Sequence, residues 1–76
     1  EGNNTVAYGD NSHAEGYQSQ ATGQNAHSEG ENNIASGQGA HAEGGAGTTA
    51  SNKYAHAEGY GTTASAQAAH SEGYNT

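Results

Sequence analysis

A tetrapeptide, His-(Ala/Ser)-Glu-Gly, recurs about every fourteen residues along this 76-residue chain. Self-similarity at a fixed short period is typical of a solenoid, in which each repeat forms one coil and stacks on its neighbours. We therefore expect residues 1–76 to form a single array of about five coils, and both ends to fall inside a repeat of a longer chain. The complete copies are His13–Gly16, His27–Gly30, His41–Gly44, His56–Gly59 and His70–Gly73, and Glu1-Gly2 ends a sixth.

The spacing changes once, between His41 and His56, which lie fifteen residues apart. The extra residue falls within Gly45-Ala46-Gly47, a stretch of small residues between two repeats. Solenoids tolerate insertions in loops, because a loop can lengthen without moving the strands on either side. We expect the coils before and after this loop to stay in register.

Each repeat predicts two short strands in an all-β fold, for example Ala55–Glu58 and Thr62–Ser65. Glycine recurs in every repeat and no apolar stripe of helical period is present, which argues against helix. We expect a turn at the glycine after each glutamate: Gly2, Gly16, Gly30, Gly44, Gly59 and Gly73. Since side chains alternate across a strand, His56 and Glu58 should point outward when Ala55 and Ala57 point inward. The alanines expected inside the coils from the second strand are Ala7, Ala21, Ala35, Ala50 and Ala64.

The composition offers little for a globular core. Hydrophobic residues make up 29%, mostly alanine, and Phe, Met, Trp and Cys are absent. Burial of an alanine methyl contributes about 0.8 kcal/mol, against roughly 1.5–3 kcal/mol for a larger apolar side chain. The chain is therefore either disordered, or it associates with identical copies and buries further surface between them. The absence of proline and the regular repeat favour association.

The charge balance excludes some partners. The net charge is −7 and there is a single basic residue, Lys53, whereas nucleic acids and anionic lipids require clustered Lys or Arg. No apolar run approaches the ~20 residues that cross a membrane. We expect no nucleic-acid partner and no membrane insertion.

The repeat resembles the head repeats of trimeric autotransporter adhesins, the YadA-like left-handed parallel β-roll. Those repeats run Ser-Val-Ala-Ile-Gly, then a linker, then Ala-x-(Ser/Ala)-Gly. Here Ser12–Gly16 occupies the first motif, and Ala21–Gly23 and Ala35–Gly37 the second. Histidine replaces the valine and glutamate the isoleucine in every complete copy. This polar version is similar to repeats of bacteriophage tail fibres and of some Gram-positive surface proteins.

The resemblance implies a parallel homotrimer of 14-residue β-roll coils, with the valine and isoleucine positions near the shared axis. One histidine per glutamate would allow imidazole N–H groups to bond the carboxylates, which would otherwise be costly to bury. The alternative is a column that faces solvent. The residues concerned are His13, Glu15, His27, Glu29, His41, Glu43, His56, Glu58, His70 and Glu72.

Metal binding and catalysis are weaker interpretations. Rings of imidazoles suit a transition metal, and the candidate ligands would be His13, His27, His41, His56 and His70. Stacked solenoid histidines are more often structural, so we expect no cofactor. A His–Glu pair repeated identically in every coil is unlike an active site, which is one local constellation. We expect no enzyme activity.

The expected function is that of a structural fibre segment, extracellular on a bacterial surface or part of a virion tail fibre, which supports attachment to a host or receptor. The alternative is a direct adhesive module whose side faces bind a glycan or a matrix protein. Tyr17, Tyr60 and Tyr74 follow the repeated glycine, either as packing residues or as exposed aromatic groups for glycan stacking.

Overall fold

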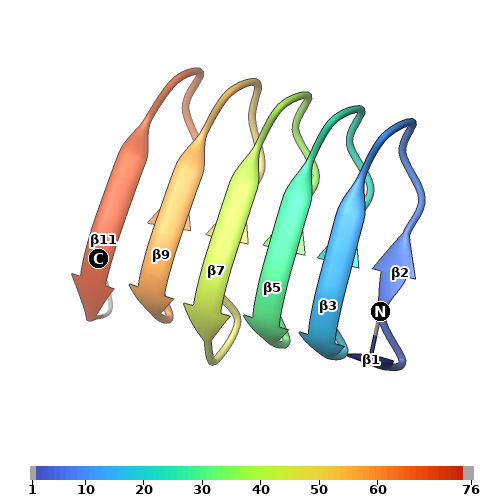
Figure 1. Ribbon diagram of the computed structural model, residues 1–76. Helices are drawn as coiled ribbons and strands as arrows, with labels where there is room; N and C mark the ends of the chain where they lie inside the picture. The colour runs from blue at the N-terminus through green and yellow to red at the C-terminus, as the bar shows by residue number, and fades with distance from the viewer. Residues whose placement is uncertain (1, 75–76) are drawn as a thin grey trace.

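The computed structural model describes residues 2–74 as a solenoid with two parallel sheets, one on each side of the stacked coils (Figure 1). The larger sheet contains β1 (Gly2–Asn3), β3 (His13–Tyr17), β5 (His27–Glu31), β7 (His41–Gly45), β9 (His56–Tyr60) and β11 (His70–Tyr74). The smaller sheet contains β2 (Val6–Ala7), β4 (Gln20–Ala21), β6 (Ile34–Ala35), β8 (Thr49–Ala50) and β10 (Thr63–Ala64). The prediction of an all-β solenoid with 14-residue coils is confirmed.

Equivalent residues of successive coils lie directly beside one another. His27 pairs with His41, and Ala21 pairs with Ala35. The coil with the extra residue keeps this register, since His41 still pairs with His56. The insertion is confined to the loop between β7 and β8, as expected.

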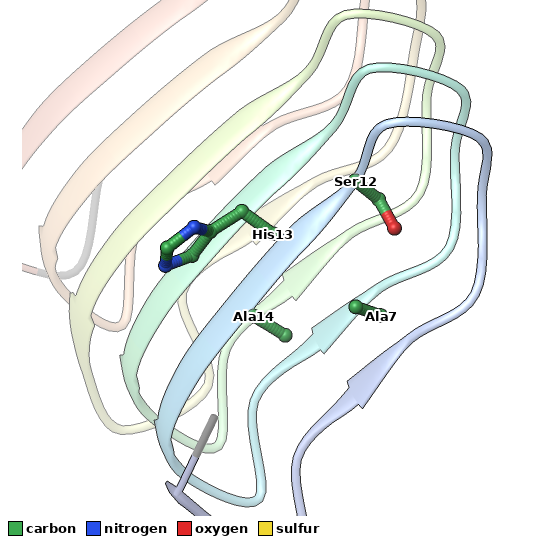
Figure 2. Close-up of a pocket in the computed structure, with 4 residues that line it drawn as sticks. All are labelled: Ala7, Ser12, His13 and Ala14. Atoms are coloured by element: carbon green, nitrogen blue, oxygen red, sulfur yellow. The ribbon is translucent and has the colours of Figure 1, made fainter.

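The interior between the two sheets is thin and is lined by small side chains. Within residues 2–74, the buried apolar side chains are all alanines, and the principal extents of the molecule are 26 × 21 × 9 Å. Alanines of both sheets meet there, as Figure 2 shows for Ala7 and Ala14, while His13 points away from the interior. Of the alanines expected inside, Ala21, Ala35, Ala50 and Ala64 are buried, whereas Ala7 is exposed. Ala7 lies in the first coil and borders a hollow there with Ser12, His13 and Ala14.

The repeated glycines lie inside strands, and the prediction that they turn the chain is wrong. Gly30 belongs to β5, with φ of 119°, and a Cβ atom on it would lie 1.8 Å from the carbonyl oxygen of Gly44. Only glycine fits such close backbone approach at positive φ. The same extended backbone with positive φ, from 109° to 126°, occurs at Gly2, Gly16, Gly30, Gly44, Gly59 and Gly73.

The second strand is also shorter than expected, because only Thr63 and Ala64 of the range 62–65 pair as a strand. The turn comes before it, where Gly61 adopts a left-handed conformation with φ of 60°. Across residues 2–74 no helix is long and apolar enough to cross a membrane.

Left-handed residues lie at either end of the larger-sheet strands, with two in succession, Ala46 and Gly47, after β7. Such a conformation costs roughly 1–2 kcal/mol for an ordinary L-residue, and glycine and asparagine tolerate it best. At the turn that precedes the larger-sheet strand, Asn11 and Asn25 have φ of 60° and 61°, and Ala68 occupies the equivalent position with φ of 60°. Ala68 is therefore a strained residue in an exposed turn.

We predict that Ala68→Asn raises the free energy of unfolding by about 0.5–1 kcal/mol, because asparagine lowers the cost of positive φ. Urea denaturation at one fixed protein concentration measures the change. The matched control is Ala66→Asn, an exposed alanine without positive φ whose equivalent in the preceding coil is Asn52. Equal stabilisation by both substitutions would contradict the assignment of strain to Ala68.

Candidate functional site

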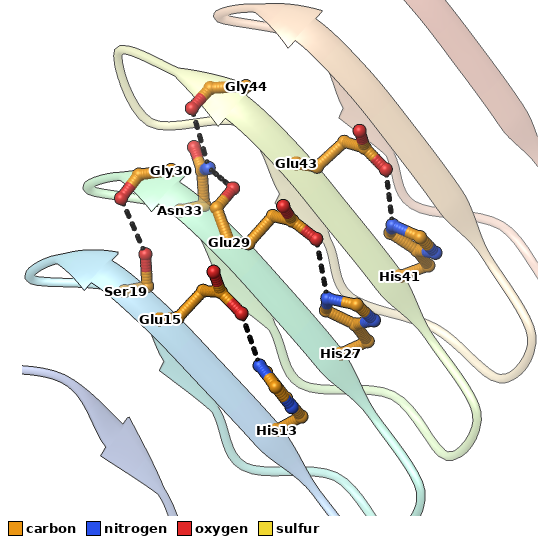
Figure 3. A network of polar contacts seen from close by, with 10 residues as sticks. All are labelled: His13, Glu15, Ser19, His27, Glu29, Gly30, Asn33, His41, Glu43 and Gly44. Atoms are coloured by element: carbon orange, nitrogen blue, oxygen red, sulfur yellow. Dashed lines mark hydrogen bonds and ion pairs between the residues drawn. The ribbon is translucent and has the colours of Figure 1, made fainter. Parts of the chain in front are cut away.

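The outer face of the larger sheet carries one His–Glu pair per coil, and we name these ten residues the His–Glu column. Histidine and glutamate are two residues apart, so strand alternation places both side chains on the same face. The Nε2 atom lies 2.5–2.8 Å from the glutamate Oε1 atom in every pair. Figure 3 shows three successive pairs, His13–Glu15, His27–Glu29 and His41–Glu43. The column therefore has the outward orientation, relative to its own coil, that alternation predicts.

The imidazole rings of the column stack along the solenoid. Ring centroids are 4.6 Å apart from His27 to His41, with planes 11° from parallel, and the pairs that follow are stacked at the same distance. The first pair differs, because His13 and His27 are tilted by 38° at 4.9 Å. This stacking follows from the register of the sheet, which places neighbouring strands about 4.8 Å apart.

Each pair places an imidazole beside a carboxylate within its own coil. Like charges directly opposite one another on neighbouring strands are destabilising, and the register places Glu29 beside Glu43. An ionised carboxylate can only accept a hydrogen bond, so the imidazole Nε2–H donates where the geometry is suitable, as at His13 and His41. Each carboxylate therefore has an imidazole beside it in its own coil.

The column is only partly exposed in the middle of the stack. Side-chain exposure at His41 and Glu43 is 33% and 39%, against 54% and 63% at His70 and Glu72. The larger sheet thus presents a row of half-buried polar groups in the middle of the stack. Contact between this row and further copies of the chain stays a prediction.

A second row of polar side chains lies inside the coils, and the sequence analysis did not identify it. We name it the polar ladder; its members have 0% exposure and are Ser19, Asn33, Thr48 and Thr62. Ser19 Oγ donates to the carbonyl of Gly30, and Thr48 Oγ1 to that of Gly59, in each case in the next coil. Figure 3 shows that Ser19 and Asn33 approach glycines of neighbouring strands. The ladder therefore supplies hydrogen-bond donors to glycine carbonyls near the ends of the larger-sheet strands.

Asn33 makes the most contacts in the polar ladder. Its Nδ2 atom donates to the carbonyls of Glu29, at 2.6 Å, and Gly44, at 2.9 Å. Its Oδ1 atom accepts from the Thr48 amide, at 3.1 Å. The sequence signal was a small hydroxyl or amide residue directly before each second strand, at Thr5, Ser19, Asn33, Thr48 and Thr62.

The tyrosines that follow the repeated glycine are exposed. Tyr17, Tyr60 and Tyr74 have exposures of 45%, 52% and 69%, and the rings of Tyr60 and Tyr74 stack with centroids 4.9 Å apart. Glu31 and Gly45 occupy the equivalent positions of the two middle coils. The aromatic row is therefore interrupted, and only one pair of neighbouring rings forms a platform.

Comparisons with protein-family models, with curated proteins and with solved structures found no match for this chain. The resemblance to trimeric adhesin heads and tail-fibre repeats therefore stays a prediction, and functional inference depends on the geometry of the coils.

We predict that Asn33→Ala lowers the free energy of unfolding by about 2–3 kcal/mol, because buried carbonyls and an amide lose their partner. Chemical denaturation monitored by circular dichroism measures this loss. Asn33→Thr is the matched variant, since threonine fills the same position in two later coils, and it should recover part of the loss. An Asn33→Ala protein as stable as the wild type would contradict the role given to the polar ladder.

Proposed function

We propose that this chain is a structural segment of a homotrimeric fibre, on a bacterial surface or a virion tail, that supports attachment to a host or receptor. The observation that carries the proposal is the alanine-only apolar interior of the described coils. Alanine burial contributes less per residue than the branched and aromatic side chains of an ordinary core. A thin stack of this kind gains most from burial against further copies of itself.

The His–Glu column is the surface that we assign to the contact between copies. A parallel trimer would bring equivalent residues of three chains to one axis, and pairing within each coil would place an imidazole beside each carboxylate there. Buried polar networks of this kind serve register and oligomer state more than stability in the best-attested cases. The half-buried state of His41 and Glu43 in a single chain supports this assignment.

The left-handed winding and the extracellular location belong to the same proposal. In Figure 1 the larger-sheet strands run downward in front, the smaller-sheet strands upward behind, and successive coils are added toward the left, which supports left-handed winding. A net charge of −7 with a single basic residue keeps a long fibre soluble. The rest of the outer surface would remain free for solvent or a partner.

We predict that Glu43→Cys chains cross-link to one another under mild oxidation, because three equivalent cysteines would lie near the axis. Thr63→Cys is the matched control, on the exposed side of the smaller sheet, and it should not cross-link. Non-reducing electrophoresis separates the outcomes. Because each chain carries one cysteine, the expected product is a covalent dimer, with the third chain left unlinked. Equal cross-linking of both variants, cross-linking of Thr63→Cys alone, or none in either, would contradict the proposed interface.

A direct adhesive module is the second candidate function, and one surface feature favours it. A groove of about 400 Å³ is lined by Asn4, Gln18, Gln20, Asn32 and Ile34 from successive coils. Rows of side-chain amides can both donate to and accept from sugar hydroxyls. Binding on a glycan array that Gln18→Ala abolishes would favour this function over a purely structural one.

A further inference from the structure

We propose that the part of the His–Glu column from His27 to His70 binds divalent transition-metal ions, with Zn²⁺ as the probe, at sites formed between adjacent coils. Each site would use the histidine and glutamate of one coil and the histidine of the next. Every ligand of a site comes from one chain, so the proposal requires the stacked coils but no ligand from a second copy.

Three groups of side chains in the described part of the column bring their ligand atoms within 4.8 Å of one another. They are His27, Glu29 and His41; His41, Glu43 and His56; and His56, Glu58 and His70. Two imidazole nitrogens and one carboxylate oxygen form a ligand set that zinc uses in proteins, with the fourth position open to water. Imidazole also favours zinc, copper and nickel over Mg²⁺ and Ca²⁺, which prefer oxygen ligands.

Metal binding requires a local change in the side chains. Zinc with ligands at about 2.0–2.1 Å, arranged as a tetrahedron, separates the ligand atoms by about 3.4 Å. The His27 and His41 rings are nearly parallel at 4.6 Å, so they must tilt toward a shared ion. The Glu29 carboxylate, now 2.7 Å from His27 Nε2, must move slightly away.

The column has the freedom for this change. The His27 and His41 side chains are 37% and 33% exposed, so they can rotate without moving the backbone. The tilted rings of His13 and His27 show that the same backbone register accommodates a ring angle of 38°. A bound ion would take the place of the contact between imidazole Nε2 and carboxylate Oε1, and an Nε2 atom that carries a proton would release it to solvent on binding.

The three groups overlap, and this overlap limits the number of ions. The central group shares His41 with the first group and His56 with the third. The first and third groups share no residue, so both can be filled at once. We therefore expect two zinc ions per chain at saturation.

The chain supplies a matched control for this assignment. His13 pairs with Glu15 at the same distance as His41 with Glu43, 2.5 Å, yet His13 belongs to none of the three groups. Glutamine at either position removes the imidazole and keeps a polar side chain of similar length. His13→Gln should leave both expected sites intact, and His41→Gln should leave only the group of His56, Glu58 and His70.

The test is equilibrium dialysis of chelator-treated protein against Zn²⁺, with bound metal counted by elemental analysis. We expect two ions per chain for the wild type and for His13→Gln, one for His41→Gln, and none for the double variant His41→Gln/His56→Gln. Circular dichroism of each variant verifies that the β-structure is retained, and Ca²⁺ in place of Zn²⁺ should not bind.

Three results would overturn the proposal: wild-type protein that retains less than one zinc ion per chain, equal loss of zinc in His13→Gln and His41→Gln, or equal binding of Ca²⁺ and Zn²⁺. Sedimentation of the same samples reports the oligomeric state separately. If the protein binds two ions per chain but does not form a trimer, only the proposed fibre is contradicted. If it forms a trimer but binds no ions, only the metal sites are contradicted.

Discussion

The rest of the structure depends on the in-register parallel stacking of one coil on the next. Because each residue lies beside its equivalent in the neighbouring coil, every choice of side chain is repeated along a whole row. Glycine beside glycine allows the backbones to approach so closely that a Cβ atom on Gly30 would overlap the Gly44 carbonyl. The repeated tetrapeptide is thus a consequence of stacking, since a departure in one coil affects the coils on both sides.

Stacking also creates the main electrostatic problem of the fold, and the His–Glu column places an imidazole beside each of the carboxylates concerned. Register places carboxylates about one strand spacing apart, where like charges repel. A histidine two residues earlier supplies each carboxylate with a nearby imidazole in the same coil. In the resulting row each carboxylate has an imidazole neighbour, and the middle of the row is half-buried; both properties suit a surface that meets other copies or holds metal ions.

Much of the fold could be predicted from the repeat, because strand alternation and periodicity are properties of the sequence alone. They gave the outward direction of His56 and Glu58 and the inward direction of Ala57 and Ala64. They did not place the turn. The repeated glycine is required for close approach to the backbone of the neighbouring coil, and it lies within a strand rather than at a bend. The left-handed residues before the larger-sheet strands were not predicted, because Ala68 and Tyr54 interrupt a position that asparagine or glycine fills in the other coils.

The candidate site was predictable as a set of residues, but its geometry was not. Spacing identified the His–Glu pairs, whereas ring stacking and the three metal-ligand groups depend on distances between coils. The polar ladder was missed because Ser19, Asn33 and Thr48 differ in side chain and share only size and hydrogen-bonding capacity. Their common role becomes visible once each one lies beside a glycine carbonyl of the next coil.

The most direct test of the account is the dependence of folding on association, measured by sedimentation equilibrium and far-ultraviolet circular dichroism across a dilution series. A solenoid whose apolar interior is alanine should show β-structure only while it sediments at three times the mass of one 7.6 kDa chain. Both signals should be lost together on dilution. An ordered β-structure at the mass of a single chain would contradict the central claim.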